Sequence, residues 1–202
     1  MDKLFKVNKK LKYSIIIITI IGIISGALFL YVLKDNDLES IHKSIENFSN
    51  SVLNNNLNYF LSLKSSLITN IIYILIIWLL GFTIIGFPII LFMYFIKSFT
   101  IGFAISSLVH VFKLKGIIYS IIYIFPHNFI NIIIYAYITI HSIIYSYHIS
   151  SNFFKKNNID YKSITDKHKY LLLISILGII ITSLYGTYIM PYIFKIVLNL
   201  IK

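Results

Sequence analysis

Residues 66–112, SLITNIIYILIIWLLGFTIIGFPIILFMYFIKSFTIGFAISSLVHVF, form an almost continuous apolar stretch. As a helix, these 47 residues would be roughly 70 Å long at 1.5 Å per residue, more than twice the thickness of a bilayer core of about 30 Å. The stretch is therefore expected to cross a membrane twice. The break is predicted at Gly81–Pro88, because Pro88 lacks a backbone donor and two glycines loosen the backbone. Two spans result, at about 68–86 and about 88–112.

The composition of the remaining chain also indicates a membrane protein. Of its 202 residues, 58% are hydrophobic and 12% are charged, whereas soluble domains carry about 25% charged residues. The further spans are expected at about 13–33, at about 126–147 with a half-helix or kinked entry at 117–125 broken by Pro126, and at about 170–190, closed by Pro191. The first apolar run is too long for a cleaved secretory signal and is expected to stay as an anchor. The sequence thus predicts an all-α, polytopic membrane helical bundle of about five transmembrane helices, two of them broken by Pro or Gly, in a single integral membrane domain over 1–202.

The lysines predict the orientation of these spans. Cytoplasmic segments concentrate Lys, and this chain has two lysine-rich segments, a basic N-terminus at 1–12 and a basic loop at 148–169. With five spans, both segments fall on the same side. The chain is therefore expected in the cell membrane as a multi-pass protein, with its N-terminus cytoplasmic and its C-terminus extracytoplasmic.

An amphipathic segment follows the first predicted span. Residues 34–66 are expected to face outward, and they hold four of the seven acids. Apolar residues recur there every three or four positions, as on one face of a helix. They are Leu38, Ile41, Ile45, Phe48 and Val52. This face is a candidate partner surface; the alternative is a helix that caps the protein's own bundle.

The distribution of titratable residues argues against an enzyme. The acids, at positions 2, 35, 37, 39, 46, 160 and 166, all lie outside the predicted spans. The chain has no Cys and no H-E-x-x-H helix, and no Gly-rich phosphate loop follows a strand. We therefore expect no catalytic, cofactor-binding or metal-binding residues, and no nucleic-acid partner.

Lys97 is the outstanding polar residue within a predicted span. A lysine at the centre of a membrane helix costs about 2.5–3.5 kcal/mol, so it should find a partner or snorkel to the interface. The candidate partners are carbonyls freed by the break at Gly86–Pro88 and acids of the outward segment. A second polar set shares one face of the fourth span and is more typical of interhelical contacts than of a ligand site. It comprises His127, Asn131, His141, Tyr145 and His148.

The first span contains the pattern G-x-x-x-G at Gly22 and Gly26. Two glycines one turn apart let a second helix approach closely. One interpretation of this pattern is a homodimer formed through these glycines.

The stretch from Trp78 to Ile130 carries a more specific set of motifs. They read G-x-x-x-x-G-x-P, then K-[GS]-F-x-x-G-F, then a K-G turn, then P-H-N. The residues concerned are Gly81, Gly86, Pro88, Lys97, Ser98, Phe99, Gly102, Phe103, Lys115, Gly116, Pro126, His127 and Asn128. In this arrangement the chain resembles the stage II sporulation protein M family of endospore-forming Firmicutes. Ser98 departs from the Gly expected in the family but keeps a small residue.

The resemblance implies a function as well as a fold. Members of the family are implied to be membrane scaffolds that act during engulfment, anchoring a peptidoglycan-degrading complex with stage II sporulation proteins D and P at the septum. The alternative is a permease subunit of an ATP-driven membrane transporter, because broken helices and a buried lysine are devices that transporters use to build a midplane site.

Overall fold

The computed structural model describes residues 9–155 and 161–200, and these are helical with short connections. In chain order the helices are α1 (Lys9–Phe29, extended by a 3-10 turn Leu30–Val32), α2 (Asp35–Leu53), α3 (Tyr59–Leu80), α4 (Gly86–Phe112), α5 (Leu114–Tyr119), the π turn η2 (Ser120–Ile124), α6 (Phe125–Lys155), α7 (Tyr161–Leu184), the π turn η3 (Tyr185–Ile189) and α8 (Met190–Leu200). Within this part of the chain, five helical stretches are long and apolar enough to cross a membrane: Lys9–Val32, Tyr59–Leu80, Gly86–Phe112, Leu114–Ser151 and Ile164–Leu200. The prediction of a polytopic bundle with five transmembrane helices is confirmed.

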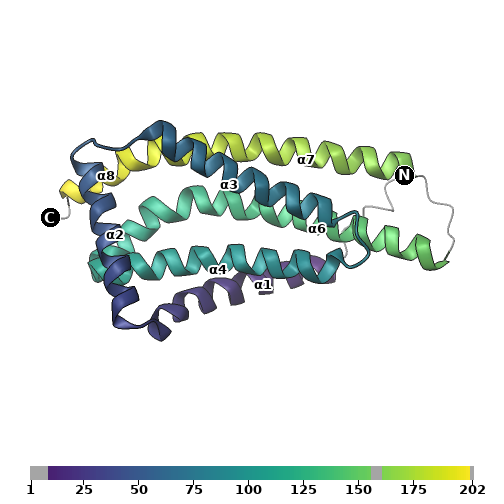
Figure 1. The fold of residues 1–202 in the computed structure, drawn as a ribbon, viewed down its shortest axis with the longest axis horizontal. Helices are drawn as coiled ribbons and strands as arrows, with labels where there is room; N and C mark the ends of the chain where they lie inside the picture. Colours follow the sequence, from purple (N-terminus) through teal and green to yellow (C-terminus); the bar gives the residue numbers. More distant parts are fainter. Residues whose placement is uncertain (1–8, 156–160, 201–202) are drawn as a thin grey trace.

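The five spans lie side by side along the long axis of the molecule (Figure 1). Helix α2 runs across one end of the bundle, next to α8, and the turn between α3 and α4 lies at the other end. Helix α1 starts at the end opposite α2. The chain therefore crosses the bundle an odd number of times, as the orientation predicted from the lysines requires. Which end of the bundle is cytoplasmic stays a prediction.

The predicted break in the 66–112 stretch is confirmed. Helix α3 ends at Leu80 and α4 begins at Gly86, with the amides of Thr83 and Gly86 bonded to the carbonyls of Leu80 and Thr83 at 3.0 and 3.3 Å. Pro88 is the third residue of α4, where a backbone N–H has no intrahelical partner to lose. Gly86 allows the turn to close, since a Cβ there would lie 2.0 Å from the carbonyl oxygen of Leu80.

The start of the second span was predicted too late in the chain. Helix α3 begins at Tyr59 rather than near 68, so the outward segment 34–66 contains α2 and also the first turns of α3. Asn58 explains this start, because its side-chain oxygen accepts a hydrogen bond from the amide of Leu61 at 3.0 Å and caps the helix. Polar residues in 59–66 follow that cap within the helix.

Neither Pro126 nor Pro191 breaks its helix as predicted. Each lies at the second position of a helix that continues directly from a π turn, η2 before α6 and η3 before α8. The last span thus runs on to Leu200 instead of closing at Pro191. The short polar turn expected around Lys115 and Gly116 is replaced by a single residue: Lys113 has positive φ (52°), and helix resumes at Leu114.

The basic segment predicted as a loop at 148–169 is largely helical. Helix α6 continues to Lys155, and α7 begins at Tyr161. Lys156, together with Lys3 and Lys6 of the basic N-terminus, lies outside the described residues.

The closest helix contact joins α1 to α4, and glycines from both helices form it. A Cβ on Gly26 would lie 2.0 Å from the carbonyl oxygen of Phe99, and a Cβ on Gly102 would lie 1.9 Å from that of Ile23. A Cβ on Gly22 would lie 2.6 Å from the Cβ of Ser98. The G-x-x-x-G pattern is therefore used within the chain, so α4 occupies the surface that a homodimer through Gly22 and Gly26 would need; dimerisation itself stays a prediction.

Candidate functional site

The apolar face of α2 packs against the bundle. Leu38, Ile41, Ile45 and Phe48 are half-buried, and Val52 is 3% exposed. The ring of Phe48 stacks on Phe194 of α8 at 6.1 Å and lies 5.5 Å from the ring of Tyr123 in η2 (centroid distances). This arrangement is the one expected for a helix that caps its own bundle, and it leaves the opposite face of α2 as the part open to a partner.

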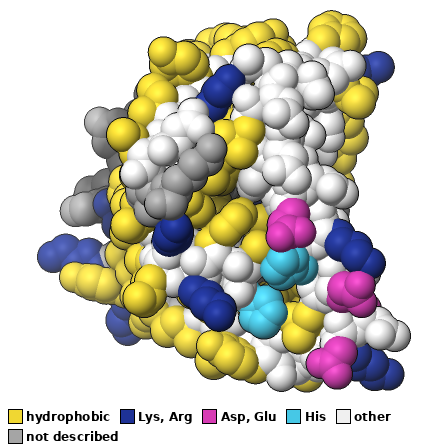
Figure 2. Space-filling model, turned by 90° about the vertical axis from the view of Figure 1, so that its left-hand side faces the viewer, with side chains coloured by type: hydrophobic (Ala, Val, Ile, Leu, Met, Phe, Trp, Pro, Cys, Tyr) yellow, Lys and Arg dark blue, Asp and Glu magenta, His cyan; other side chains and the backbone are white. Residues whose placement is uncertain are grey.

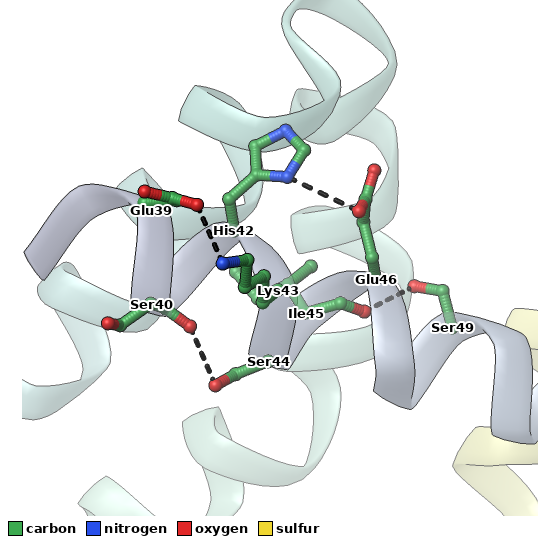
Figure 3. A network of polar contacts seen from close by, with 8 residues as sticks. All are labelled: Glu39, Ser40, His42, Lys43, Ser44, Ile45, Glu46 and Ser49. Atoms are coloured by element: carbon green, nitrogen blue, oxygen red, sulfur yellow. Dashed lines mark hydrogen bonds and ion pairs between the residues drawn. The ribbon is translucent and has the colours of Figure 1, made fainter. Parts of the chain in front are cut away.

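The opposite face of α2 is polar and exposed. Lys43 pairs with Glu39 at 2.6 Å and His42 with Glu46 at 3.4 Å, each pair one turn apart (Figure 3). Viewed from the α2 end, the molecule shows acidic, basic and histidine side chains along one side, with apolar side chains among and beside them (Figure 2). Exposed pairs of this kind contribute little stability, so their positions are free to serve recognition.

Of the cavities that border α2, two share part of their lining. The larger, of about 550 Å³, is lined by Ile41, Ile45 and Phe48 of α2, by Phe103, Ala104 and Leu108 of α4, and by Tyr123, His127 and Asn128. The smaller, of about 200 Å³, lies between α3 and η3 and is lined by Ser62, Ser66, His127, Gly186 and Thr187 among others. Phe48, Tyr123 and His127 line both. The P-H-N motif therefore stands between the two cavities.

The local backbone explains why His127 lies there. The π turn η2 widens the helix before Pro126, and the side-chain amide of Asn128 donates to the carbonyl oxygen of Ile124 at 3.0 Å. On the other side, Gly186 of η3 gives the imidazole room, since a Cβ there would lie 3.3 Å from the His127 ring. Two π turns thus meet at one histidine, and π turns are frequent at functional sites.

Lys97 lies in a polar cluster between α3, α4 and α6. Its ammonium donates to the side-chain oxygen of Asn70 at 3.0 Å, and the hydroxyl of Tyr135 donates to the same oxygen at 2.6 Å. The Nζ atom also lies over the rings of Tyr73 and Tyr135, 5.2 and 5.0 Å from their centroids. Neither of the predicted partners is used: an amide oxygen and two aromatic faces hold the charge in place of freed carbonyls or acids.

The cluster continues toward the α2 end through hydroxyl groups. The amide of Asn70 donates to Ser66 Oγ at 3.3 Å, and Ser66 donates to Ser183 of α7 at 3.1 Å. Ser66 also lines the smaller cavity. A line of hydrogen bonds therefore joins Lys97 to the space beneath α2.

Two residues of the polar face predicted on the fourth span make the expected interhelical contacts. Asn131 accepts from Thr182 of α7 at 2.5 Å, and Tyr145 bonds to Thr165 at 2.8 Å. His141 packs edge-on against Tyr137, and His148 against Tyr147. The face is spread along α6 and does not converge on one point.

The remaining motif residues serve close packing. Phe99 packs edge-on against Phe29 of α1, which adds to the α1–α4 contact. Gly116 lets α5 approach α4, because a Cβ there would lie 2.2 Å from the carbonyl oxygen of Leu108. Gly81 caps the end of α3 beside His168, and a Cβ on Gly81 would lie 3.0 Å from the Nε2 atom of His168. These contacts, with Gly86 and Pro88, shape the bundle rather than a reactive centre.

Two groups of residues were missed at the sequence level. One is the set that holds Lys97: Asn70, Tyr73 and Tyr135. The other is an aromatic stack at the end opposite α2, where His168 lies between Tyr145 and Trp78 at 4.4 and 5.4 Å and Trp78 donates to the His168 carbonyl at 3.1 Å. Asn70 could have been found, since it is an amide within an apolar run that must hydrogen-bond inside a membrane.

The comparisons with known proteins agree with the motifs. Neither the curated proteins nor the solved structures contain a significant match to this chain. The family model of stage II sporulation protein M matches residues 15–191, most of the chain, including all five spans in whole or in part. The chain therefore belongs to the stage II sporulation protein M family.

Proposed function

We propose that this protein is a membrane scaffold in sporulation that anchors and localises a peptidoglycan-degrading complex at the septum during engulfment. Family membership is the observation that carries the proposal. Within the proposal, the partners are stage II sporulation proteins D and P, and the α2 end of the bundle faces them from the extracytoplasmic side.

The exposed face of α2 is the part of this end best suited to contact a partner. Glu39, Lys43 and Glu46 are exposed and form ion pairs within α2. Glu46 also borders a cavity of about 390 Å³ between α2 and the bundle. The apolar face is less suitable, because its residues pack on α4, α8 and η2. Polar substitutions at Ile41 or Phe48 would displace α2 and would not distinguish recognition from folding.

The proposal is tested by co-purification of tagged protein with stage II sporulation proteins D and P. The variant Glu39→Lys/Glu46→Lys reverses two charges on the exposed face, and Lys64→Glu, at the exposed start of α3, is a charge-reversal control outside α2. We expect the double variant to lose most of the recovered partner while Lys64→Glu keeps it. Full recovery with the double variant would exclude this face, and no recovery with the unsubstituted protein would exclude the partners.

The cellular part of the proposal has its own test. A fluorescent fusion should appear in the mother cell at the septum, and deletion should scatter the hydrolases around the membrane and block engulfment. A fusion that is absent from sporulating mother cells would overturn the scaffold function.

The permease function retains one supporting observation, the buried Lys97 cluster. It requires an ATPase that binds the end of the bundle between α6 and α7. Co-purification of an ATPase, in place of the hydrolases, would favour this function.

A further inference from the structure

We infer that the smaller cavity beneath α2 is the mouth of a water-accessible, anion-selective path that ends at Lys97 in the middle of the bundle. This inference is independent of the scaffold proposal. It concerns what can reach the buried lysine and not which protein binds α2.

The depth of Lys97 is the first step. It lies near the middle of α4, which runs over 27 residues and crosses the membrane. A charge at that depth is costly unless it is hydrogen-bonded or hydrated. An ammonium has three N–H donors, and among the described residues one oxygen, that of Asn70, accepts from it.

The second step is that a further polar atom of the cluster lacks a hydrogen-bond partner among the described residues. The hydroxyl of Tyr73, whose ring lies beneath Nζ, is buried without a hydrogen bond to any described residue. Buried polar groups in proteins are almost always bonded to protein or to ordered water. Donors that the described residues leave without acceptors therefore indicate water at this site.

The third step is the route by which water arrives. Ser62, Ser66 and Asn70 follow one another at intervals of four residues and so share one face of α3. Ser62 and Ser66 line the cavity of about 200 Å³, together with Thr187 and His127. Ser66 bonds to Asn70, and Asn70 bonds to Lys97. The cavity thus reaches to within two hydrogen bonds of the ammonium.

The sign of the charge sets the selectivity. The described spans carry no carboxylate near Lys97 that would neutralise it: Asp166, the acid within them, lies near the start of α7, away from η3 and the cavity. The polar side chains along the route are hydroxyls, an amide and an imidazole, all able to donate to an anion. Phe48, Leu57 and Pro191 supply apolar lining of the cavity. A positive charge at the closed end of a narrow, low-dielectric path attracts anions and repels cations. The chemical class of solute that fits the path is therefore a small anion.

The absence of Cys from the sequence makes this directly testable, because single-cysteine variants need no background substitution. Ser66→Cys and Ser183→Cys place a thiol on the path from two different helices. Ile68→Cys is the matched control, since it lies two residues farther along α3 and is 47% exposed on the outside of the bundle, where lipid would contact it. Asn56→Cys, in the exposed α2–α3 connection, is the positive control.

Each variant is treated, in right-side-out and in inverted membrane vesicles, with thiosulfonate reagents of equal size that carry a negative or a positive charge. We expect labelling at positions 66 and 183 from the side that labels Asn56→Cys, and none at Ile68→Cys. The anionic reagent should react at Ser66→Cys about tenfold faster than the cationic one, and Lys97→Met should remove most of this preference.

The results separate the two parts of the inference. If the Ser66→Cys and Ser183→Cys variants are both unreactive while the Asn56→Cys variant is labelled, no water path exists. Labelling with no charge preference, or a preference unchanged by Lys97→Met, would overturn the anion selectivity. Recovery of the hydrolases in the scaffold test is unaffected by either outcome, so the two proposals fail independently.

Discussion

The close contact between α1 and α4 predicts that Gly26→Ala lowers the free energy of unfolding, whereas replacing Gly by Ala in a helix usually raises it. Replacing Gly by Ala within a helix ordinarily stabilises it by roughly 0.5–1 kcal/mol, because Ala loses less backbone entropy on folding. At Gly26 the added Cβ would lie 2.0 Å from the Phe99 carbonyl oxygen, about 1.4 Å short of the 3.4 Å at which ordinary contact begins. The obstacle is backbone, so it moves only if the whole helix moves.

The cost of Gly26→Ala follows from this displacement. Overpacking a close contact costs about 1–3 kcal/mol, and a fixed backbone atom favours the upper half of that range. The matched control is Gly178→Ala on α7, where the Cβ would meet the tip of the flexible Ile134 side chain at 2.8 Å. We expect the control to change the free energy of unfolding by less than about 1 kcal/mol.

The free energy of unfolding can be measured by titrating detergent-solubilised protein with dodecyl sulfate and following the fluorescence of Trp78, the one tryptophan of the chain. A double variant adds a second check. Gly102→Ala acts at the same crossing, because its Cβ would lie 1.9 Å from the Ile23 carbonyl oxygen. Once one alanine has pushed the helices apart, the second should cost less than it does alone. Unchanged or increased stability of Gly26→Ala would refute the reasoning.

Three further predictions follow from the same contacts. Asn70→Ala should destabilise the protein by about 1–3 kcal/mol, because it removes the oxygen that accepts from the buried Lys97 ammonium. Lys97→Met should cost less, because it removes the charge itself. Dodecyl sulfate titration of both variants compares the two losses. Phe48→Ala should cost about 2–4 kcal/mol and loosen α2, because it removes a half-buried ring that stacks on Phe194 of α8 and contacts Tyr123 of η2. Faster proteolysis within α2 would report the loosening, and an unchanged digestion pattern would contradict it. Trp78→Phe should cost about 1 kcal/mol, because it loses the 3.1 Å bond to the His168 carbonyl while an aromatic ring remains. Thermal unfolding followed by circular dichroism measures this cost, and a loss as large as that of Trp78→Ala would contradict the prediction, because it would show that the retained ring contributes nothing.

The number of spans could be predicted from the sequence because it depends on length alone. A run such as 66–112 is too long for one crossing, and Gly86 with Pro88 mark where it turns. Helix starts were harder, since Asn58 caps α3 from within a polar segment that hydropathy assigns to the outside. Capping depends on one side-chain oxygen and is nearly invisible in an averaged pattern.

The partners of the helices could not be predicted in the same way. Helices α1, α3 and α4 are apolar on all sides, so periodicity does not indicate which face meets protein and which meets lipid. Gly22 and Gly26 did mark a close contact, but nothing in the pattern distinguishes a second copy from α4 of the same chain. Lys97 was recognised as costly, whereas its acceptor Asn70 lies 27 residues away on another helix.

The two prolines show how a correct local rule led to a wrong structure. Proline removes a donor and its ring collides with the preceding turn, so a break was predicted at Pro126 and at Pro191. The chain instead widens the turn before each: the amides of Phe125 and Met190 bond to the carbonyls of Ser120 and Tyr185, five residues back. A widened turn makes room for the pyrrolidine ring while the helix continues, which matters in a membrane because an open break would expose backbone groups to lipid.

This widening also connects the fold to the candidate site. Both π turns contribute to the smaller cavity: η2 through Tyr123 and η3 through Gly186 and Thr187. Regular α-helix in both places would carry a proline clash and would pack more tightly around His127. The π turns before Pro126 and Pro191, where helix breaks were predicted, therefore border the smaller cavity, and the path proposed to lead to Lys97 begins there.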